Sequence, residues 1–117
     1  MIPDAKQIQQ LEKRGYIVES GSNENGSWIK YSDGTMICYG EVTASANSAS
    51  VTATLPNTFI DKNYSIVTMN AYANTPTIFW SGGGITNDTI ALYPREFSGN
   101  TITKSERCRY IAIGKWK

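Results

Sequence analysis

The feature that most constrains the fold of this chain is a pair of turn signals near its N-terminal end. The dipeptides Asn25-Gly26 and Asp33-Gly34 tolerate the positive φ angles of tight turns between strands. Residues 27–32, between these turns, alternate in polarity as a half-buried β-strand does. The segment therefore predicts a β-hairpin, and nothing in it indicates catalysis.

The rest of the chain after Gly15 continues this period of two, and no strong helical pattern returns. Turn residues separate the candidate strands, which are residues 16–19, 27–32, 35–43, 50–55, 64–72, 78–81, 88–93 and 107–115. Short strands at regular spacing, without helices between them, favour antiparallel pairing over a parallel sheet. We therefore expect an all-β fold, an antiparallel β-sandwich over residues 16–117.

One helical candidate precedes the strands, at residues 4–14. Ala5, Ile8 and Leu11 recur at every third position, and Gly15 suits the end of a helix. A helix this short is marginal in water unless it finds a partner surface. We expect either that residues 1–15 pack with other copies of the same helix around an axis, or that they form a frayed terminus.

Length and charge exclude several classes of function. A chain of 117 residues accommodates one folded domain. The 11 basic and 10 acidic residues give a net charge of +1, which provides no electrostatic footprint for nucleic acid. No apolar segment approaches the length of a signal peptide or a membrane span. We therefore expect synthesis in a cytoplasm, no membrane insertion and no nucleic-acid partner.

The cysteines and the missing histidines limit metal and cofactor chemistry. Cys38 and Cys108 lie in predicted strands, where buried reduced thiols are expected and a disulfide is the alternative. Two sulfurs without a histidine are too few ligands for a zinc site. The glycines at 82–84 are not followed by the Gly-Lys-Ser/Thr of a phosphate-binding loop, and they predict a flexible turn. We expect no metal and no cofactor.

Catalysis is not expected either. The chain lacks histidine, the commonest general base. A glycosidase needs only two carboxylates at a set separation. The available carboxylates show no paired spacing: Asp33, Glu41, Asp61, Asp88, Glu96 and Glu106. We therefore expect a protein that is not an enzyme.

Several segments together resemble a known family. They are ESGSNENGSWIKYSDGTMICYG at 19–40, Leu55-Pro56 with Phe59, Asn63-Tyr64, and YIAIGKW at 110–116. The pattern resembles the C-terminal domain of bacteriophage and prophage tail-fibre proteins, in the H-type-lectin-like group. The resemblance extends from Gly15 to Lys117 and implies a β-sandwich that forms a homotrimer, with ligands near the subunit boundaries at one end. It also implies a place in the virion tail after synthesis in the bacterial host cytoplasm, with residues 1–15 joining a fibre shaft.

The function that follows from this resemblance is that of a distal tip domain, which adheres to bacterial surface glycans for host recognition. One alternative is a structural domain that trimerises or caps the fibre without a ligand of its own. Another is an accessory domain of a depolymerase. Retention on a glycan array, or saccharide hydrolysis that depends on one carboxylate, distinguishes the three.

The candidate ligand-binding residues come from aromatic rings near loops, because sugars stack their apolar faces on such rings. Phe79 and Trp80 are neighbours in a predicted strand, so one ring faces the core and the other faces outward. We expect Trp80 to face outward and to line a saccharide site with Asn74, Asp88 and Arg95. Phe79 and Tyr93 suit the core equally well.

The last predicted strand is apolar on both faces. A strand of this kind is usually covered on both sides, and in a small sandwich the second cover is most simply another subunit. One face contains Arg107, Arg109, Ile111, Ile113 and Lys115, and the other contains Cys108, Tyr110, Ala112, Gly114 and Trp116. The strand therefore predicts an oligomer.

Overall fold

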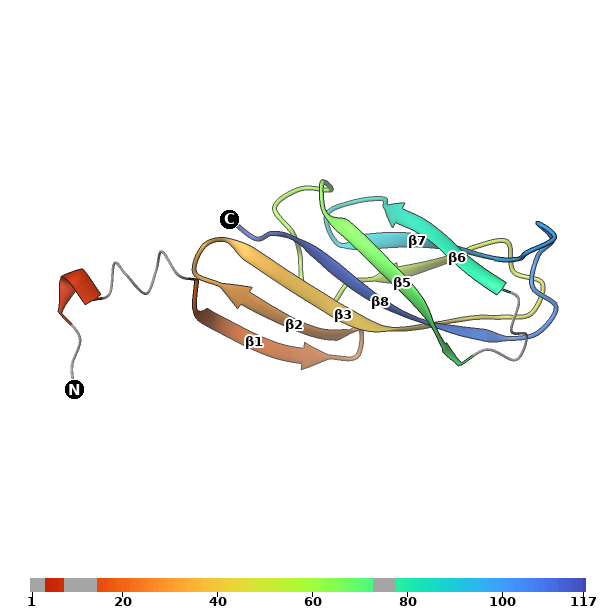
Figure 1. The fold of residues 1–117 in the computed structure, drawn as a ribbon, viewed down its shortest axis with the longest axis horizontal. Coiled ribbons are helices and arrows are strands. Elements are labelled where there is room, and N and C mark those ends of the chain that lie inside the picture. The colour runs from red at the N-terminus through yellow and green to blue at the C-terminus, as the bar shows by residue number, and fades with distance from the viewer. Residues whose placement is uncertain (1–3, 8–14, 73–77) are drawn as a thin grey trace.

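The computed structural model describes residues 4–7, 15–72 and 78–117, which form eight strands (Figure 1). The strands are β1 (Ile17–Asn23), β2 (Gly26–Tyr31), β3 (Thr35–Ala44), β4 (Val51–Thr54), β5 (Ser65–Tyr72), β6 (Ile78–Gly84), β7 (Thr89–Glu96) and β8 (Glu106–Lys115). Five of them form sheet A in the order β1-β2-β3-β8-β5, and three form sheet B in the order β4-β7-β6. Every pairing is antiparallel, which confirms the predicted sandwich.

The predicted hairpin is present, with its turns where the sequence indicates them. Gly26 and Gly34 adopt φ angles of 139° and 97°, in the region that favours glycine. Asp33 accepts a hydrogen bond from the Thr35 amide through Oδ1 at 2.8 Å, which closes the second turn. β3 then pairs with β8 along its whole length.

Only the start of the helical candidate lies in the described residues. The Asp4 amide donates to Gln7 Oε1 at 3.0 Å, and the Gln7 amide donates back to Asp4 Oδ1 at 2.9 Å. This reciprocal pair is a capping box, the usual start of a helix. Ile8 and Leu11, on which the packing of a longer helix depends, lie outside the described residues.

Two expectations about strand ends are wrong. The glycines at 82–84 continue β6 and pair with residues 90–92 of β7. Gly84 leaves room for the core, because a Cβ there would lie 2.8 Å from the Tyr64 ring, whereas a Cβ at Gly83 would meet nothing within 4 Å. Pro94, which directly follows the strand predicted at residues 88–93, lies inside β7. It lies beyond Leu92, the last β7 residue that pairs with β4, so its missing N–H removes no bond to β4.

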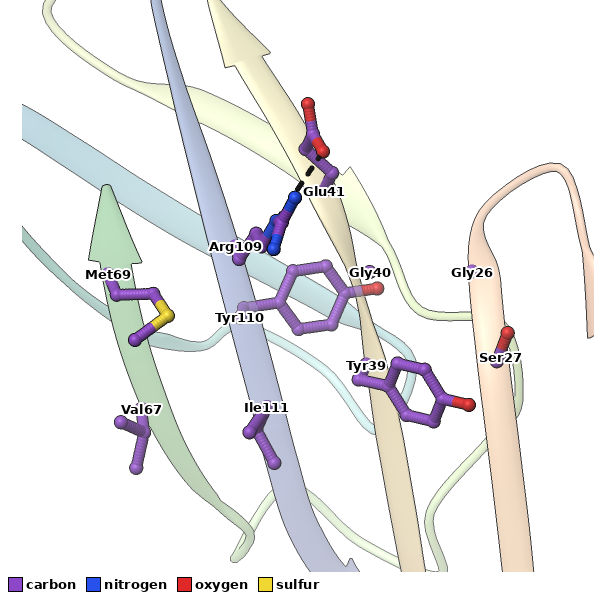
Figure 2. A pocket seen from close by; sticks show the side chains of 10 residues that line it. All are labelled: Gly26, Ser27, Tyr39, Gly40, Glu41, Val67, Met69, Arg109, Tyr110 and Ile111. Atoms are coloured by element: carbon purple, nitrogen blue, oxygen red, sulfur yellow. Dashed lines mark ion pairs between the residues drawn. The ribbon is translucent and has the colours of Figure 1, made fainter. Parts of the chain in front are cut away.

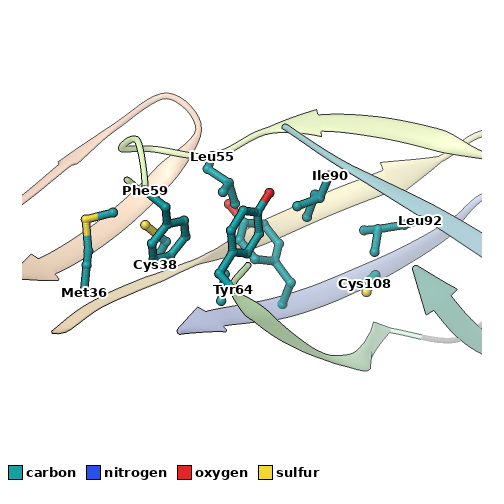
Figure 3. Packing of buried hydrophobic residues seen from close by; sticks show 10 residues of the cluster. Met36, Cys38, Leu55, Phe59, Tyr64, Ile90, Leu92 and Cys108 are labelled. Atoms are coloured by element: carbon teal, nitrogen blue, oxygen red, sulfur yellow. The ribbon is translucent and has the colours of Figure 1, made fainter. Parts of the chain in front are cut away.

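The main core lies between the two sheets (Figure 3). Its buried members are Met36, Cys38, Leu55, Phe59, Tyr64, Ile90, Leu92, Cys108, Tyr110 and Ala112. The Phe59 and Tyr64 rings stack with centroids 4.5 Å apart. A smaller cluster of Ala44, Ile78 and Ile102 fills the end of the sandwich beside it. Both cysteines are buried and unpaired, as predicted.

Candidate functional site

The four predicted site residues do not form one site. Trp80 lies opposite Pro94 in the β6–β7 ladder, whereas Asp88 belongs to the turn beyond Gly84. Four residues of extended chain separate Trp80 from Gly84, a distance of about 13 Å. Asn74 lies outside the described residues. The structure therefore leaves Trp80 and Arg95 as diagonal neighbours in the ladder, on opposite sides of sheet B, and places Asp88 at the opposite end of the hairpin.

Trp80 faces the core, so the expectation that it points outward is wrong. Its ring is partly buried and packs against both hydrophobic clusters. Its Nε1 donates to Asn70 Oδ1 on β5 at 2.7 Å. The expected alternation holds with the opposite phase, because Ile78, two residues earlier, is only 3% exposed and fixes the inward side of β6.

Asp88 stabilises a turn. Its Oδ1 accepts a hydrogen bond from Thr86 Oγ1 at 3.0 Å, and its backbone oxygen accepts one from the Leu55 amide at 2.7 Å. The turn also supports the core, because the Tyr64 hydroxyl lies 2.8 Å from the Thr86 carbonyl oxygen. These contacts account for the aspartate without a ligand.

The outward side of β6 and β7 carries a group of exposed rings that we name the aromatic patch: Phe79, Tyr93 and Phe97. Phe79 and Tyr93 are each 42% exposed, and Phe97 is 68% exposed. The Phe79 and Phe97 rings stack, with centroids 5.9 Å apart and planes at 27°. The sequence allows Phe79 and Tyr93 to face either the core or the surface. The phase of β6 places both rings on the outward side of sheet B.

Arg95 lies beside the aromatic patch, directly opposite Phe79 in the ladder. Its Nη1 donates to the backbone oxygens of Ala49 and Pro94 at 2.6 and 2.7 Å. These two bonds hold the guanidinium group in place at the sheet B surface. A fixed cation next to exposed rings can bind a polar ligand that also has an apolar face.

A second surface lies on the outward side of sheet A, where strands β2, β3, β8 and β5 enclose a shallow hollow of about 500 Å³ (Figure 2). We name its aliphatic floor the sheet A patch: Val67, Met69, Ile111 and the neighbouring Ile113. Val67 and Met69 are 60% and 61% exposed, and both isoleucines are 45% exposed. The two-faced pattern predicted for β8 is thus confirmed.

Charges border the sheet A patch. Glu41 pairs with Arg107 at 3.0 Å and with Arg109 at 3.8 Å, from Oε1 and Oε2 respectively. Two arginines share one carboxylate, so the border is cationic. Apolar surface rimmed by charge is typical of protein contacts.

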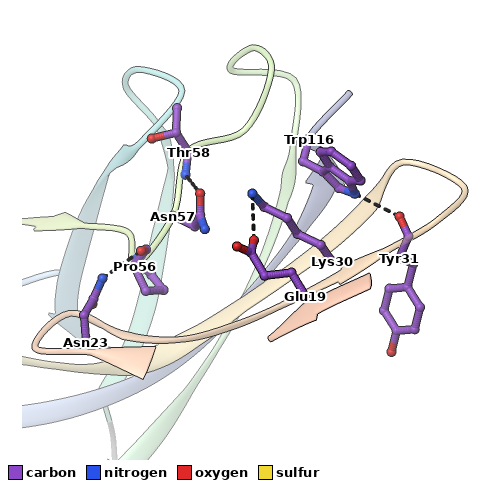
Figure 4. A network of polar contacts seen from close by, with 8 residues as sticks. All are labelled: Glu19, Asn23, Lys30, Tyr31, Pro56, Asn57, Thr58 and Trp116. Carbon is purple, nitrogen blue, oxygen red and sulfur yellow. Dashed lines mark hydrogen bonds and ion pairs between the residues drawn. The ribbon is translucent and has the colours of Figure 1, made fainter. Parts of the chain in front are cut away.

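Trp116, near the C-terminus, packs and hydrogen-bonds within the fold (Figure 4). Trp116 Nε1 donates to the Tyr31 backbone oxygen at 2.9 Å, and Lys30 Nζ lies 5.2 Å from its ring centroid. Lys30 also pairs with Glu19 at 2.9 Å, and this hydrogen bond lowers the pKa of the Glu19 carboxyl group. Trp116 therefore fastens the chain end to the β1–β2 hairpin.

The described residues contain no group of three acidic, histidine or cysteine side chains that could hold a metal ion. Among them there is also no helix long and apolar enough to cross a membrane.

Comparison with known families agrees with this architecture. The family model described as "Putative tail fiber protein gp53-like, C-terminal" matches residues 30–115. The molecule is thus a tail-fibre C-terminal domain of the phage type, as predicted. The chain belongs to the gp53-like tail-fibre family.

Solved pyocin fibres share the fold. The N-truncated R1-type pyocin tail fibre is 15% identical with a TM-score of 0.60, and the alignment covers 97% of this chain and 98% of that one. The P. aeruginosa R1 pyocin fibre comprising residues 323–701 is 15% identical with a TM-score of 0.61, over 97% and 32% of the two chains. The P. aeruginosa R2 pyocin fibre is 16% identical with a TM-score of 0.60, over 97% and 30%. The chain therefore spans about a third of the longer fibres. Comparison with the curated proteins gives no match.

Proposed function

We propose that this domain is the distal tip of a phage or prophage tail fibre, which adheres to bacterial surface glycans as a homotrimer. The observation that carries the homotrimer is the sheet A patch, an uncovered aliphatic surface, and the adhesive role is supported by membership of a tail-fibre family. Tail-fibre membership supports a component of the virion tail. Buried reduced thiols are compatible with synthesis in the host cytoplasm.

The chemistry of the sheet A patch favours a protein subunit over a sugar. Val67, Met69 and Ile111 offer no hydrogen-bonding groups, so sugar hydroxyls would be left unpaired against them. The Ser27 and Tyr39 hydroxyls lie only on the β2–β3 side of the hollow. Apolar side chains of another copy give up no hydrogen bonds when they cover the sheet A patch. Each CH₂ that they bury contributes about 0.8 kcal/mol to binding. A closed ring of copies covers the patch in each subunit.

A trimer supplies multivalency. A weak glycan site present once per subunit becomes an avid one when three sites engage the same cell surface, because the later contacts form at a high effective concentration. Adhesion therefore needs no tight single site and no catalytic group. We propose a binding module and not an enzyme, since Glu41 is ion-paired and Asp88 closes a turn.

The test is an array of bacterial lipopolysaccharides, capsular polysaccharides and teichoic acids, probed with the labelled full chain. We expect retention on a subset of saccharides, strongly dependent on the density of the immobilised sugar. The matching polysaccharide should compete far better than its single repeating unit. Retention that is independent of density, or equal competition by both, would contradict the multivalent mechanism.

A second candidate function is supported by the same patch, namely a structural domain that trimerises or caps the fibre. It predicts a stable trimer that no saccharide on the array retains. That outcome would remove glycan adhesion and leave assembly as the function of the domain.

A further inference from the structure

We infer that the outward side of sheet B is the saccharide-binding surface, with the aromatic patch as its platform and Arg95 as its anionic-group receptor. The inference rests on the proposed adhesive function and deepens it by assigning a site and a ligand class. The ligand is an acidic saccharide, one that presents a carboxylate or phosphate beside an apolar sugar face. Of the residues first expected in the site, only Arg95 is retained.

The stacked rings supply the platform. Phe79 on β6 and Phe97, directly after β7, combine into one continuous surface, because their centroids are 5.9 Å apart and their planes differ by 27°. Tyr93 extends it along β7, on the same side, opposite Ser81. Rings in this arrangement can receive the C–H face of a pyranose, while the Tyr93 and Ser81 hydroxyls are suited to its polar edge.

Arg95 supplies the selectivity. One nitrogen of its guanidinium group is committed to the backbone of Ala49 and Pro94, which fixes the side chain and leaves N–H groups for a ligand. Within the described part of the chain, none of the ion pairs involves Arg95. A charge-assisted bond to an anionic group is about twice as strong as a neutral one. The surface therefore favours acidic over neutral sugars.

The size of the aromatic patch also favours a sugar. A fully covered aromatic side chain buries 150–250 Å², so three rings at these exposures offer roughly 300 Å². A stable protein interface needs about 800 Å² per partner. The platform by itself is smaller than such an interface, and it is large enough for one or two sugar rings.

The experiment uses the same array, with neutral saccharides compared against those containing uronic acid or phosphate. Affinities for a retained oligosaccharide are then measured by titration. We expect Phe79→Ala and Phe97→Ala each to weaken binding about tenfold, and Arg95→Gln to abolish the preference for acidic sugars. Tyr16→Ala removes a similarly exposed ring from the other end of the sandwich and should bind as the wild type does.

Thermal melting accompanies each titration, because the rings are exposed and their removal should leave the fold intact. Wild-type binding that Phe79→Ala and Phe97→Ala do not weaken would overturn the assigned surface and leave the adhesive function standing. Equal binding of neutral and acidic sugars by the wild type would overturn the role of Arg95. A wild type that no saccharide retains would overturn both the inference and the proposed function.

Discussion

The two thiols show how burial alone controls a residue's chemistry. Cys38 pairs with Ala112 and Cys108 pairs with Val42 in the β3–β8 ladder. These positions are four residues apart, about 13 Å along the strand. A disulfide requires Cα atoms closer than about 7 Å. The native fold therefore keeps the thiols apart on the inward side of sheet A.

Both thiols should be unreactive in the native protein. Burial raises the pKa of Cys38 and of Cys108 from 9.0 to about 11, so almost no thiolate is present at pH 8. A soluble aromatic disulfide reagent should detect no thiol in the folded chain and two after denaturation. Rapid labelling of the folded chain would show that the core opens readily. Denatured protein that gives no thiol without reductant would reveal a disulfide.

At the scale of single residues, the sequence does not predict which strand positions need glycine to make room for a neighbouring ring. A Cβ at Gly114 would lie 2.6 Å from Tyr64 Cβ, and one at Gly21 would lie 2.5 Å from Trp28 Cζ2. Gly114 lies beneath the Tyr64 ring, which comes from a distant part of the chain, whereas Gly21 lies beneath the ring of Trp28, its partner in the β1–β2 hairpin. Turn glycines such as Gly26 and Gly34 are predictable because their constraint is local, whereas the constraint on Gly114 depends on tertiary packing.

At the scale of the strand, the alternation in β8 was predictable and the phase of β6 was not. In β8, buried and exposed residues alternate from Glu106 to Ile113, and the polarity of the arginines fixes which side is outward. In β6, adjacent Phe79 and Trp80 are both large and aromatic, so either phase satisfies the pattern. The contact of Ile78 with Ile102, from a loop far along the chain, selects the observed one.

The undetermined phase of β6 also explains why the sequence does not predict which residues gather at the surface of sheet B. An aromatic ring beside a loop suits a sugar site, and this favours an outward position for Trp80. In the structure its indole N–H instead donates a hydrogen bond to Asn70 on β5. Arg95 lies on β7 opposite Phe79, and the identity of its aromatic neighbours depends on the phase of β6, which the sequence does not determine. Asp88 appeared close because the chain turns there, although β6 carries it away from Trp80.

Trp80→Ala tests the phase of β6. The change removes a ring that packs on both clusters together with its hydrogen bond to Asn70, and buried Trp→Ala changes cost 3–5 kcal/mol. Since Trp80 is only partly buried, we expect a loss of about 2–4 kcal/mol in the free energy of unfolding. Phe97→Ala is the matched control and should lose less than about 1 kcal/mol, because its ring is exposed.

Chemical denaturation of the two variants measures the difference. A Trp80→Ala variant as stable as the wild type would mean that the ring is dispensable to the core. If that stable variant also lost saccharide binding, the site would return to Trp80 and away from the aromatic patch.

At the scale of the whole molecule, the two sheets present opposite outward surfaces with different chemistry. Sheet A exposes aliphatic side chains bordered by Glu41, Arg107 and Arg109, and sheet B exposes rings beside a fixed guanidinium group. The two sheets form two layers that face each other (Figure 1). An assembly that buries the outward side of sheet A therefore leaves the outward side of sheet B free. Trimerisation and saccharide binding are therefore compatible in one domain.

The assembly can be tested directly by mass. Light scattering of the purified chain at micromolar concentration should give three times the 12.9 kDa of one chain. Ile111→Glu places a carboxylate in the centre of the sheet A patch, where burial against a second copy would leave the charge unpaired, so we expect dissociation to monomers. Ile85→Glu changes an equally exposed isoleucine in the β6–β7 turn and should remain a trimer.

The variant pair separates a specific interface from general solubility. If both glutamate variants dissociate, the added charge acts on the molecule as a whole and the sheet A patch is not the contact. If the wild type is a monomer across the micromolar range, the trimer and the avidity argument fail together. A trimeric Ile85→Glu variant beside a monomeric Ile111→Glu variant would place the contact on β8, because the two substitutions differ only in the surface they charge.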